Sequence, residues 1–316
     1  MGRCGERVAD GSVDGVIEVN ELTKRYGGTT AVNGLTFTVR SGRVTGFLGP
    51  NGAGKSTTLR LILGLNAPTS GTVTVHGRPF RDHRRGLRHV GALLDAGDVH
   101  GGRTARAHLT ALAVANRIPR TRVAQVLAEV GLSGAAGRRI GGFSLGMRQR
   151  LGIAAALLGD PPVLLFDEPL NGLDPEGVQW VRGLFRGLAA EGRTVFVSSH
   201  LMSEMEHTAD ELVVVGRGEL IAAESLPEFA ARGGSHSVTV VTPEPAALAA
   251  ALTAEGGTVR EADGVLSVTG LKAAAIGELA LRQGVPLHEL TPRASLEEAF
   301  MELTADRVEY TAGGAR

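Results

Sequence analysis

Short apolar runs alternate with longer amphipathic stretches over the first two thirds of the chain. Apolar runs and period-two alternation indicate strands, and a spacing of three to four residues indicates helices. The predicted strands are residues 16–22, 35–39, 43–48, 72–75, 90–94, 163–167, 194–198 and 211–215. The predicted helices are residues 55–65, 104–130 with a break near Pro119, and 144–158. This alternation predicts an α/β fold with a mostly parallel sheet covered by helices.

A second pattern begins after Arg232-Gly233-Gly234, which is typical of a linker. The elements predicted there are strand 236–241, helix 245–255, strand 258–261, strand 265–269, helix 271–283, strand 286–290 and helix 295–304. This βαββαβ order is that of a small α+β ferredoxin-like module. The expected organisation is a flexible tail at 1–15, a domain at 16–224 with a helical subdomain at about 96–158, a linker at 225–235, an accessory domain at 236–308 and a tail at 309–316.

Composition and charge exclude several classes of protein. The 33 basic and 33 acidic residues cancel, which argues against a nucleic-acid partner, and an apolar content of 43% excludes wholesale disorder. The single cysteine, Cys4, excludes an internal disulfide framework and indicates a reducing compartment. No apolar run reaches the ~18 residues of a membrane span, and residues 1–14 carry no signal-peptide pattern. A membrane role is therefore expected only through a partner.

Residues 49–56, Gly-Pro-Asn-Gly-Ala-Gly-Lys-Ser, fit the phosphate-loop pattern G-x-x-x-x-G-K-[ST] between a predicted strand and a predicted helix. Backbone N–H groups of such a loop surround phosphate oxygens, and the helix N-terminus adds positive potential. Lys55 offers a compact charge to the β- and γ-phosphates of a nucleotide, and Ser56 offers a hydroxyl to Mg²⁺. The alternative is a chance glycine-rich turn. The residues expected to bind the phosphates are Gly49, Pro50, Asn51, Gly52, Ala53, Gly54, Lys55, Ser56 and Thr57.

Two adjacent carboxylates, Asp167 and Glu168, follow the apolar strand predicted at 163–167. A buried strand that ends in two acids needs a partner for them, because an unpaired buried charge is costly. We expect Asp167 to face Mg²⁺ and Glu168 to act as base toward a water molecule aligned on the γ-phosphate. The alternative is a strand end with two solvated acids. Together with the phosphate loop, the pair indicates a nucleotide hydrolase or phosphotransferase.

Three further segments decide between these classes: Phe143-Ser144-Leu145-Gly146-Met147, Asn171-Gly172-Leu173-Asp174, and His200 after a strand. With the two motifs above, in this order and spacing, residues 16–223 resemble the nucleotide-binding domain of ABC transporters, a P-loop NTPase with a helical subdomain. The resemblance implies that Ser144 and Gly146 form the signature loop that contacts ATP, that Asp174 belongs to the D-loop and that His200 is the switch histidine. It also implies that Tyr26 stacks on adenine. Locally, Ser144 is also a plain helix cap, His200 a structural histidine and Tyr26 a surface aromatic.

The chain departs from the family pattern at two places. Leu145 and Met147 replace the usual Gly and Gln of the signature, although Ser144 and Gly146 remain. Asp95 stands where the family commonly has a glutamine, after the strand predicted at 90–94. A carboxylate can approach Mg²⁺ directly but donates no hydrogen bond. We expect Asp95 in the shell of the γ-phosphate and Mg²⁺, and a cap of the loop before Gly97 is the alternative.

Residues 287–300 resemble the tail of ATPase subunits of daunorubicin-type drug-resistance exporters. This resemblance implies an ATPase that couples ATP hydrolysis to transmembrane transport, with ATP and Mg²⁺ as ligands and a drug-like or lipid-like compound as cargo. It implies a head-to-tail homodimer at the cytoplasmic face of the cell membrane and a separate integral-membrane permease of about six spans. The alternatives are a soluble ABC-type ATPase switch on a ribosome or DNA and a metabolic kinase.

Overall fold

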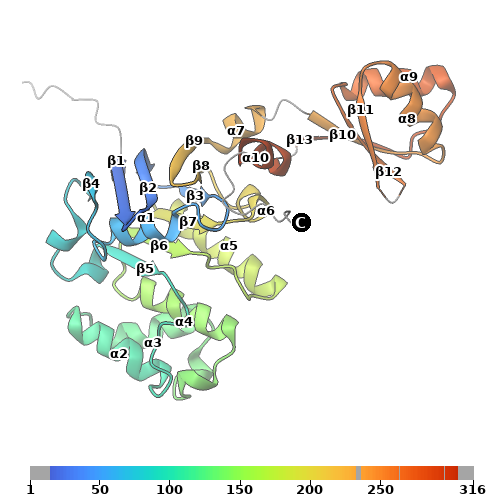
Figure 1. Cartoon of the computed structure of the whole chain (residues 1–316). Helices are drawn as coiled ribbons and strands as arrows, with labels where there is room; N and C mark the ends of the chain where they lie inside the picture. The colour runs from blue at the N-terminus through green and yellow to red at the C-terminus, as the bar shows by residue number, and fades with distance from the viewer. Residues whose placement is uncertain (1–14, 233–235, 263, 295, 305–316) are drawn as a thin grey trace, which may run out of the picture. The chain divides into compact units, whose positions relative to one another are not determined.

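The computed structural model describes residues 15–232, 236–262, 264–294 and 296–304 (Figure 1). The chain divides into two compact units, the first of which extends to Ala223 and the second of which begins at Glu224. Within the described residues, no helix is both long and apolar enough to cross a membrane.

A six-stranded sheet with the order β5-β6-β7-β3-β8-β9 forms the centre of the first unit. Its strands are β3 (Val44–Leu48), β5 (Val90–Leu93), β6 (Val163–Asp167), β7 (Thr194–Ser199), β8 (Glu211–Gly216) and β9 (Glu219–Ser225). β5 to β6, β6 to β7, β7 to β3 and β3 to β8 pair in parallel. The central strands β3, β7 and β8 are buried along their whole length because both faces of the sheet are covered. The carboxyl ends of β3, β6 and β7 therefore meet at one edge.

A second, three-stranded sheet in this unit is antiparallel, with the order β2-β1-β4. Its strands are β1 (Gly15–Tyr26), β2 (Thr29–Arg40) and β4 (Ser70–Val75). The sequence predicted a mostly parallel sheet, as the six-stranded sheet is, but not this separate sheet. It is antiparallel because Gly27-Gly28 joins β1 to β2 in a two-residue hairpin. Phe37 of this sheet packs on Phe47 and Phe196 of the six-stranded sheet, so one core joins the two sheets.

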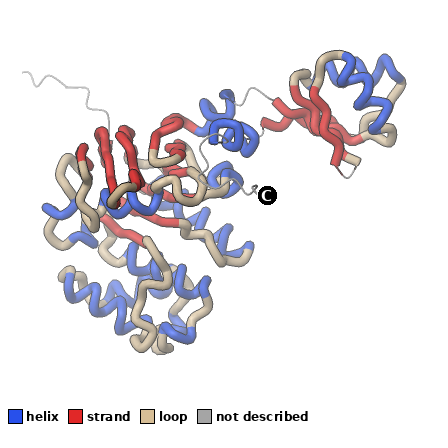
Figure 2. Tube along the Cα trace, in the orientation of Figure 1, coloured by secondary structure: helices blue, strands red, loops and turns tan. Residues whose placement is uncertain are grey.

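Helices of the first unit follow the strands that position the site (Figure 2). They are α1 (Lys55–Ile62), α2 (Ala105–Ala115), α3 (Thr121–Glu129), α4 (Leu145–Leu157), α5 (Pro175–Ala190) and α6 (Met202–Glu206). Short 3₁₀ turns occupy η1 (Phe80–Asp82), η2 (Gly86–Arg88), η3 (Ser133–Ala135) and η4 (Ile140–Gly142). α2, α3 and α4 pack on one another and form a helical region at one end of the unit (Figure 1).

The second unit contains a four-stranded antiparallel sheet with the order β11-β12-β10-β13. Its elements are α7 (Leu226–Arg232), β10 (His236–Val241), α8 (Pro245–Ala254), β11 (Thr258–Ala262), β12 (Val265–Thr269), α9 (Ala273–Gln283), β13 (Glu289–Ala294) and α10 (Leu296–Thr304). From β10 to β13 the elements follow the βαββαβ order of a ferredoxin-like module. α8 and α9 supply apolar side chains to its core, among them Leu248, Leu252 and Ile276.

The segment predicted as a linker contains a helix, α7. Ser225 accepts a hydrogen bond from the N–H of Glu228, and the Glu228 carboxylate accepts one from the N–H of Ser225, which is a capping box at the helix start. α7 also packs against α10, and its Phe229 is fully buried. Capping and packing together stabilise this helix of seven residues. The sequence predicted a linker because of the glycines after Arg232.

Candidate active site

The phosphate loop lies between β3 and α1, and its glycines are needed for steric reasons. Gly54 has φ +97°, and a Cβ there would lie 2.4 Å from the carbonyl oxygen of Ala31. A Cβ on Gly49 would lie 2.4 Å from the carbonyl oxygen of Val215. Only glycine allows this close backbone approach. The loop therefore presents its N–H groups at the N-terminus of α1, which suits an anion.

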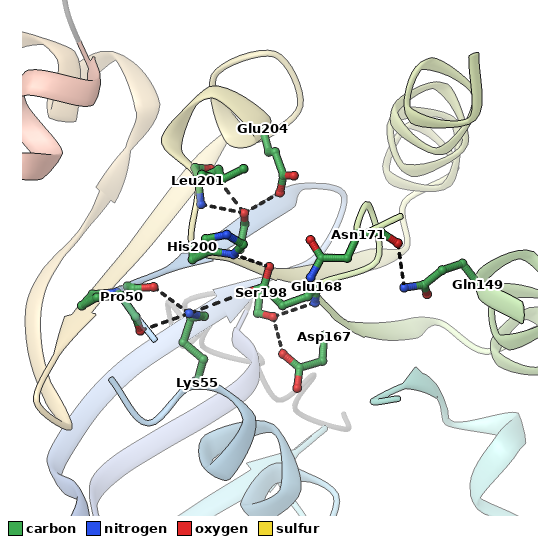
Figure 3. Close-up of polar contacts among 12 residues, drawn as sticks. Pro50, Lys55, Gln149, Asp167, Glu168, Asn171, Ser198, His200, Leu201 and Glu204 are labelled. Carbon is green, nitrogen blue, oxygen red and sulfur yellow. Dashed lines mark hydrogen bonds and ion pairs between the residues drawn. The ribbon is translucent and has the colours of Figure 1, made fainter. Parts of the chain in front are cut away.

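Lys55 is the buried cation of this loop, with 6% of its surface exposed. Its Nζ donates to the carbonyl oxygens of Gly49 at 2.6 Å and Pro50 at 3.3 Å, and it lies 3.5 Å from Oε1 of Glu168 (Figure 3). Burial lowers the pKa of Lys55, while the charges of Glu168 and Asp167 act in the opposite direction. The ammonium is thus held between the loop and the carboxylates.

Ser198 organises the two carboxylates at the end of β6. Its hydroxyl donates to Oδ1 of Asp167 and accepts the N–H of Glu168 at 3.0 Å. β6 and β7 pair with Asp167 opposite Ser198, so the hydroxyl lies where both acids can use it. We did not predict Ser198 as a site residue, because this register is not visible in either strand alone. The sequence signal that could have identified Ser198 is a serine at the end of a strand that lies next to the strand ending in two acids.

Glu168 connects the loop to His200. Its backbone is left-handed, with φ +47°, which is uncommon for a side chain of this size. Oε2 of the carboxylate lies 2.9 Å from Nδ1 of His200, and Oε1 faces Lys55. Figure 3 shows these side chains converging from β6, from α1 and from the end of β7. The structure thus brings together Lys55, Asp167, Glu168 and His200 of the predicted set.

Ser144 and Asp174 act as helix caps in the structure. Ser144 accepts the N–H of Met147 at the start of α4, and Asp174 accepts the N–H of Gly177 at the start of α5. Among the described residues, no hydrogen bond or ion pair joins either side chain to Lys55 or Glu168.

The signature and D-loop segments contact each other within the chain. Gln149 of α4 donates to the carbonyl oxygen of Asn171 at 3.3 Å, and Leu145 packs onto Gly172. A Cβ on Gly146 would lie 3.5 Å from the carbonyl oxygen of Gly172. The two segments therefore pack together, and the N–H of Asn171 donates to the carbonyl oxygen of Glu168 at 3.3 Å, which links them to the carboxylate beside Lys55.

Tyr26 keeps a partly exposed ring. It is 47% exposed, its hydroxyl accepts a hydrogen bond from Asn66 Nδ2 at 2.7 Å, and Lys24 Nζ lies 4.9 Å from the ring centroid. Ser56, expected to face Mg²⁺, is exposed on the first turn of α1.

Asp95 caps the loop that follows β5. Its Oδ1 accepts the N–H of Gly97 at 2.6 Å, and the residue is exposed. No group of three or more histidine, cysteine or acidic residues able to hold a metal occurs in the described part of the chain. The structure thus shows the loop cap before Gly97, and the place of Asp95 in the shell of the γ-phosphate and Mg²⁺ stays a prediction.

Comparison with known proteins relates this geometry to a family. The model of the ABC transporter family matches residues 32–171, and that of a domain of unknown function (DUF8746) matches residues 236–297. The chain is 34% identical to the uncharacterized ABC transporter ATP-binding protein YhcH of Bacillus subtilis (strain 168), over 93% of this chain and 97% of that protein. It is 41% identical to the bacitracin transport ATP-binding protein BcrA of Bacillus licheniformis, over 67% of this chain and 70% of BcrA.

A solved structure has the same fold. It is described as the dimeric structure of MJ0796, a bacterial ABC transporter cassette, and it matches with a TM-score of 0.62 and 25% identity over 66% of this chain and 98% of that one. The resemblance to ABC ATPases and the P-loop NTPase fold predicted from the sequence are confirmed. The chain belongs to the ABC transporter ATP-binding proteins, and it is an ABC-type ATPase.

Proposed function

We propose that this ATPase powers export of a drug-like or lipid-like compound through a separate integral-membrane permease. The observation that carries the proposal is the Glu168 carboxylate, held between the Lys55 ammonium and the His200 ring. A carboxylate held in this way can accept a proton from water that attacks the terminal phosphate of ATP. The relative named for bacitracin transport supports a drug-like cargo, as does the resemblance of residues 287–300 to drug-resistance exporters.

ATP is proposed to bind with its phosphates on the loop at residues 49–57. Lys55 then exchanges the carbonyl oxygens of Gly49 and Pro50 for phosphate oxygens, which it can do by a small movement of its flexible stem. His200 keeps the Glu168 carboxylate oriented, and Tyr26 provides a ring for the adenine.

The residues present fit Mg²⁺. Ser56 and Asp167 offer oxygen ligands, which Mg²⁺ prefers, and Asp167 is already fixed at one oxygen by Ser198. A cage of three acidic or histidine ligands is absent from the described residues, as expected for an ion that is held mainly by substrate phosphates and water. When bound, Mg²⁺ neutralises charge on the β- and γ-phosphates.

A second copy of the chain is proposed to complete each nucleotide site. The sequence has one phosphate loop, and among the described residues no hydrogen bond or ion pair joins the side chain of Ser144 or Asp174 to Lys55 of the same chain. In a head-to-tail dimer, Ser144 and the N-terminus of α4 would face the ATP held by the partner copy. The dimeric cassette among solved structures supports this arrangement. We place the dimer on the cytoplasmic face of the membrane.

The test uses inside-out membrane vesicles that contain the integral-membrane protein encoded beside this gene. The chain should sediment with these vesicles and not with vesicles that lack that protein. ATP should then drive uptake of labelled bacitracin or of a labelled amphiphile, and Glu168→Gln should abolish the uptake. Two results together would refute the proposal: the chain sediments equally with and without the membrane protein, and the membrane protein does not change the rate of ATP hydrolysis.

A further inference from the structure

His200 sits in a turn that is closed by the side chain of the residue before it. β7 ends at Ser199, and the hydroxyl of Ser199 accepts the N–H of Leu201 at 3.0 Å, so the bond spans His200 (Figure 3). A serine that bonds to the backbone two residues ahead forms a local turn without help from a regular element. The backbone on both sides of His200 is therefore fixed by one hydroxyl group.

Glu204 determines the direction of that hydroxyl. From the first turn of α6 it reaches back to Ser199, whose Oγ lies 2.5 Å from Oε2 of Glu204. The other acceptor near this hydroxyl is the carbonyl oxygen of Leu201, at 3.3 Å. A serine hydroxyl has one hydrogen to donate, and it donates to the nearer acceptor, the Glu204 side chain. Its lone pairs then face the N–H of Leu201, as the turn requires.

The helix that carries Glu204 is itself well anchored. Met202 and Met205 are each 1% exposed, and they fix α6 to the core. Arg182 of α5 donates to the carbonyl oxygen of Ser203 at 3.3 Å, and Thr208 Oγ1 donates to that of Glu204 at 3.0 Å. The position of Glu204 is therefore fixed by the packing of α6, and Glu204 orients the Ser199 hydroxyl rather than being oriented by it.

The surroundings of Glu204 make a second carboxylate there costly. Burial raises its pKa, the hydrogen bond from Ser199 lowers it, the charge of Glu168 raises it, and the charges of His200 and Arg182 lower it. Burying an acid beside the Glu168–His200 pair costs free energy, and the hydrogen bond from Ser199 offsets part of that cost. No step proposed above uses the Glu204 side chain directly.

We propose that Glu204 is a positioning residue for His200, acting through the hydroxyl of Ser199. The inference rests on the role proposed for His200. It assigns the Glu204–Ser199 pair the task of holding the His200 turn so that Nδ1 stays directed at Glu168. Without the acceptor, the hydroxyl turns to the Leu201 carbonyl and no longer holds the turn in one arrangement.

The test compares Glu204→Ala with Glu206→Ala in the full chain. Glu206 lies on the same short helix, is exposed, and has no polar contact among the described residues, so it controls for loss of an acid from α6. Glu204→Ala should lower kcat about 10- to 100-fold, the size expected for a misplaced group, with KM for ATP nearly unchanged. Glu206→Ala should behave as wild type. Glu204→Gln keeps an acceptor oxygen and should restore kcat to within about threefold.

A double variant shows whether Glu204 acts through His200. Adding Glu204→Ala to His200→Ala should lower kcat no further, because the group that Glu204 positions is already gone. An NMR measurement accompanies the kinetics. It follows the resonance of the His200 ring, labelled with ¹³C at Cε1 and assigned from its absence in His200→Ala. Glu204→Ala should shift or broaden this signal, and Glu206→Ala should not.

The outcomes separate this inference from the proposed function. If His200→Ala hydrolyses ATP at the wild-type rate, the role proposed for His200 fails. If His200→Ala is impaired but Glu204→Ala matches Glu206→Ala in kcat and in the ring signal, the positioning role of Glu204 alone is overturned. A Glu204→Ala protein that loses both thermal stability and ATP affinity would also overturn it, since that pattern indicates a general folding defect.

Discussion

Replacing Glu168 with glutamine separates the charge of this side chain from its shape. In the structure one carboxylate oxygen lies 3.5 Å from Lys55 Nζ, and the other lies 2.9 Å from His200 Nδ1. The amide keeps one acceptor oxygen, but its nitrogen cannot take up a proton. The bond from the backbone N–H of residue 168 to Ser198 is untouched, so the local chain path is expected to remain.

The loss of rate follows from the loss of the base. Removal of a general base typically costs ~10²–10⁴-fold in rate, which is about 2.7–5.4 kcal/mol of activation free energy at 1.36 kcal/mol per tenfold. Binding should suffer far less, because the phosphate loop and Lys55 are intact. The charge of Glu168 opposes the effect of burial on the Lys55 pKa, so the variant lowers that pKa further until phosphates replace the lost charge.

The assay measures phosphate release under single-turnover conditions, with ATP affinity from a fluorescent analogue. Size-exclusion chromatography with ATP should then show a trapped dimer. Glu206→Gln makes the same chemical change at an exposed position and serves as control. A Glu168→Gln protein that hydrolyses ATP within about threefold of the wild-type rate, at equal affinity, would show that the base lies elsewhere.

Gly54→Ala should lower stability by about 1–3 kcal/mol and abolish ATP binding, because its Cβ would meet a backbone carbonyl at φ +97°. Gly187→Ala, in an open position of α5, should instead gain roughly 0.5–1 kcal/mol, and denaturant unfolding with ATP titration compares the two. A chain ending at Ser225 should fold and bind ATP, whereas one ending at Arg232 keeps α7 without α10 and should bind more of a hydrophobic dye. Because the pKa of Glu204 is raised, the folded state holds this proton more tightly than the unfolded chain, so stability falls as pH rises from 4.5 to the raised value. Glu204→Gln should flatten that part of the stability–pH curve measured by urea unfolding.

Elements buried on both faces could be predicted from the sequence, and elements that depend on tertiary contacts could not. β6 was predicted with its observed bounds, because a buried parallel strand is an apolar run. β13 was predicted at 286–290 but spans Glu289–Ala294, where pairing with β10 sets the register. Pro292 lies within this strand, which is possible because β13 is an edge strand and an edge strand tolerates proline.

The same division applies to the site. Lys55 and Glu168 could be placed because each follows a strand whose end is fixed by a local motif. Ser198 could be identified as a site residue only from the register between β6 and β7. In that register Asp167 pairs with Ser198, thirty-one positions further along the chain. For Asp95 the sequence left a loop cap and a ligand role open, and the structure shows the cap, because that bond depends on a residue only two positions away.

The packing of Leu145 on Gly172 makes these two positions epistatic. A Cβ at 172 would lie 2.1 Å from Cδ2 of Leu145, so alanine there collides with leucine at 145. With glycine at 145 the collision disappears, and only the backbone cost of about 1–2 kcal/mol for a left-handed residue remains. The order of substitutions therefore matters: a side chain at position 172 displaces Leu145 unless position 145 has become small first. The signature segment is therefore coupled to a residue twenty-seven positions further along the chain, and a side chain at 172 can be introduced without strain only together with a change at 145.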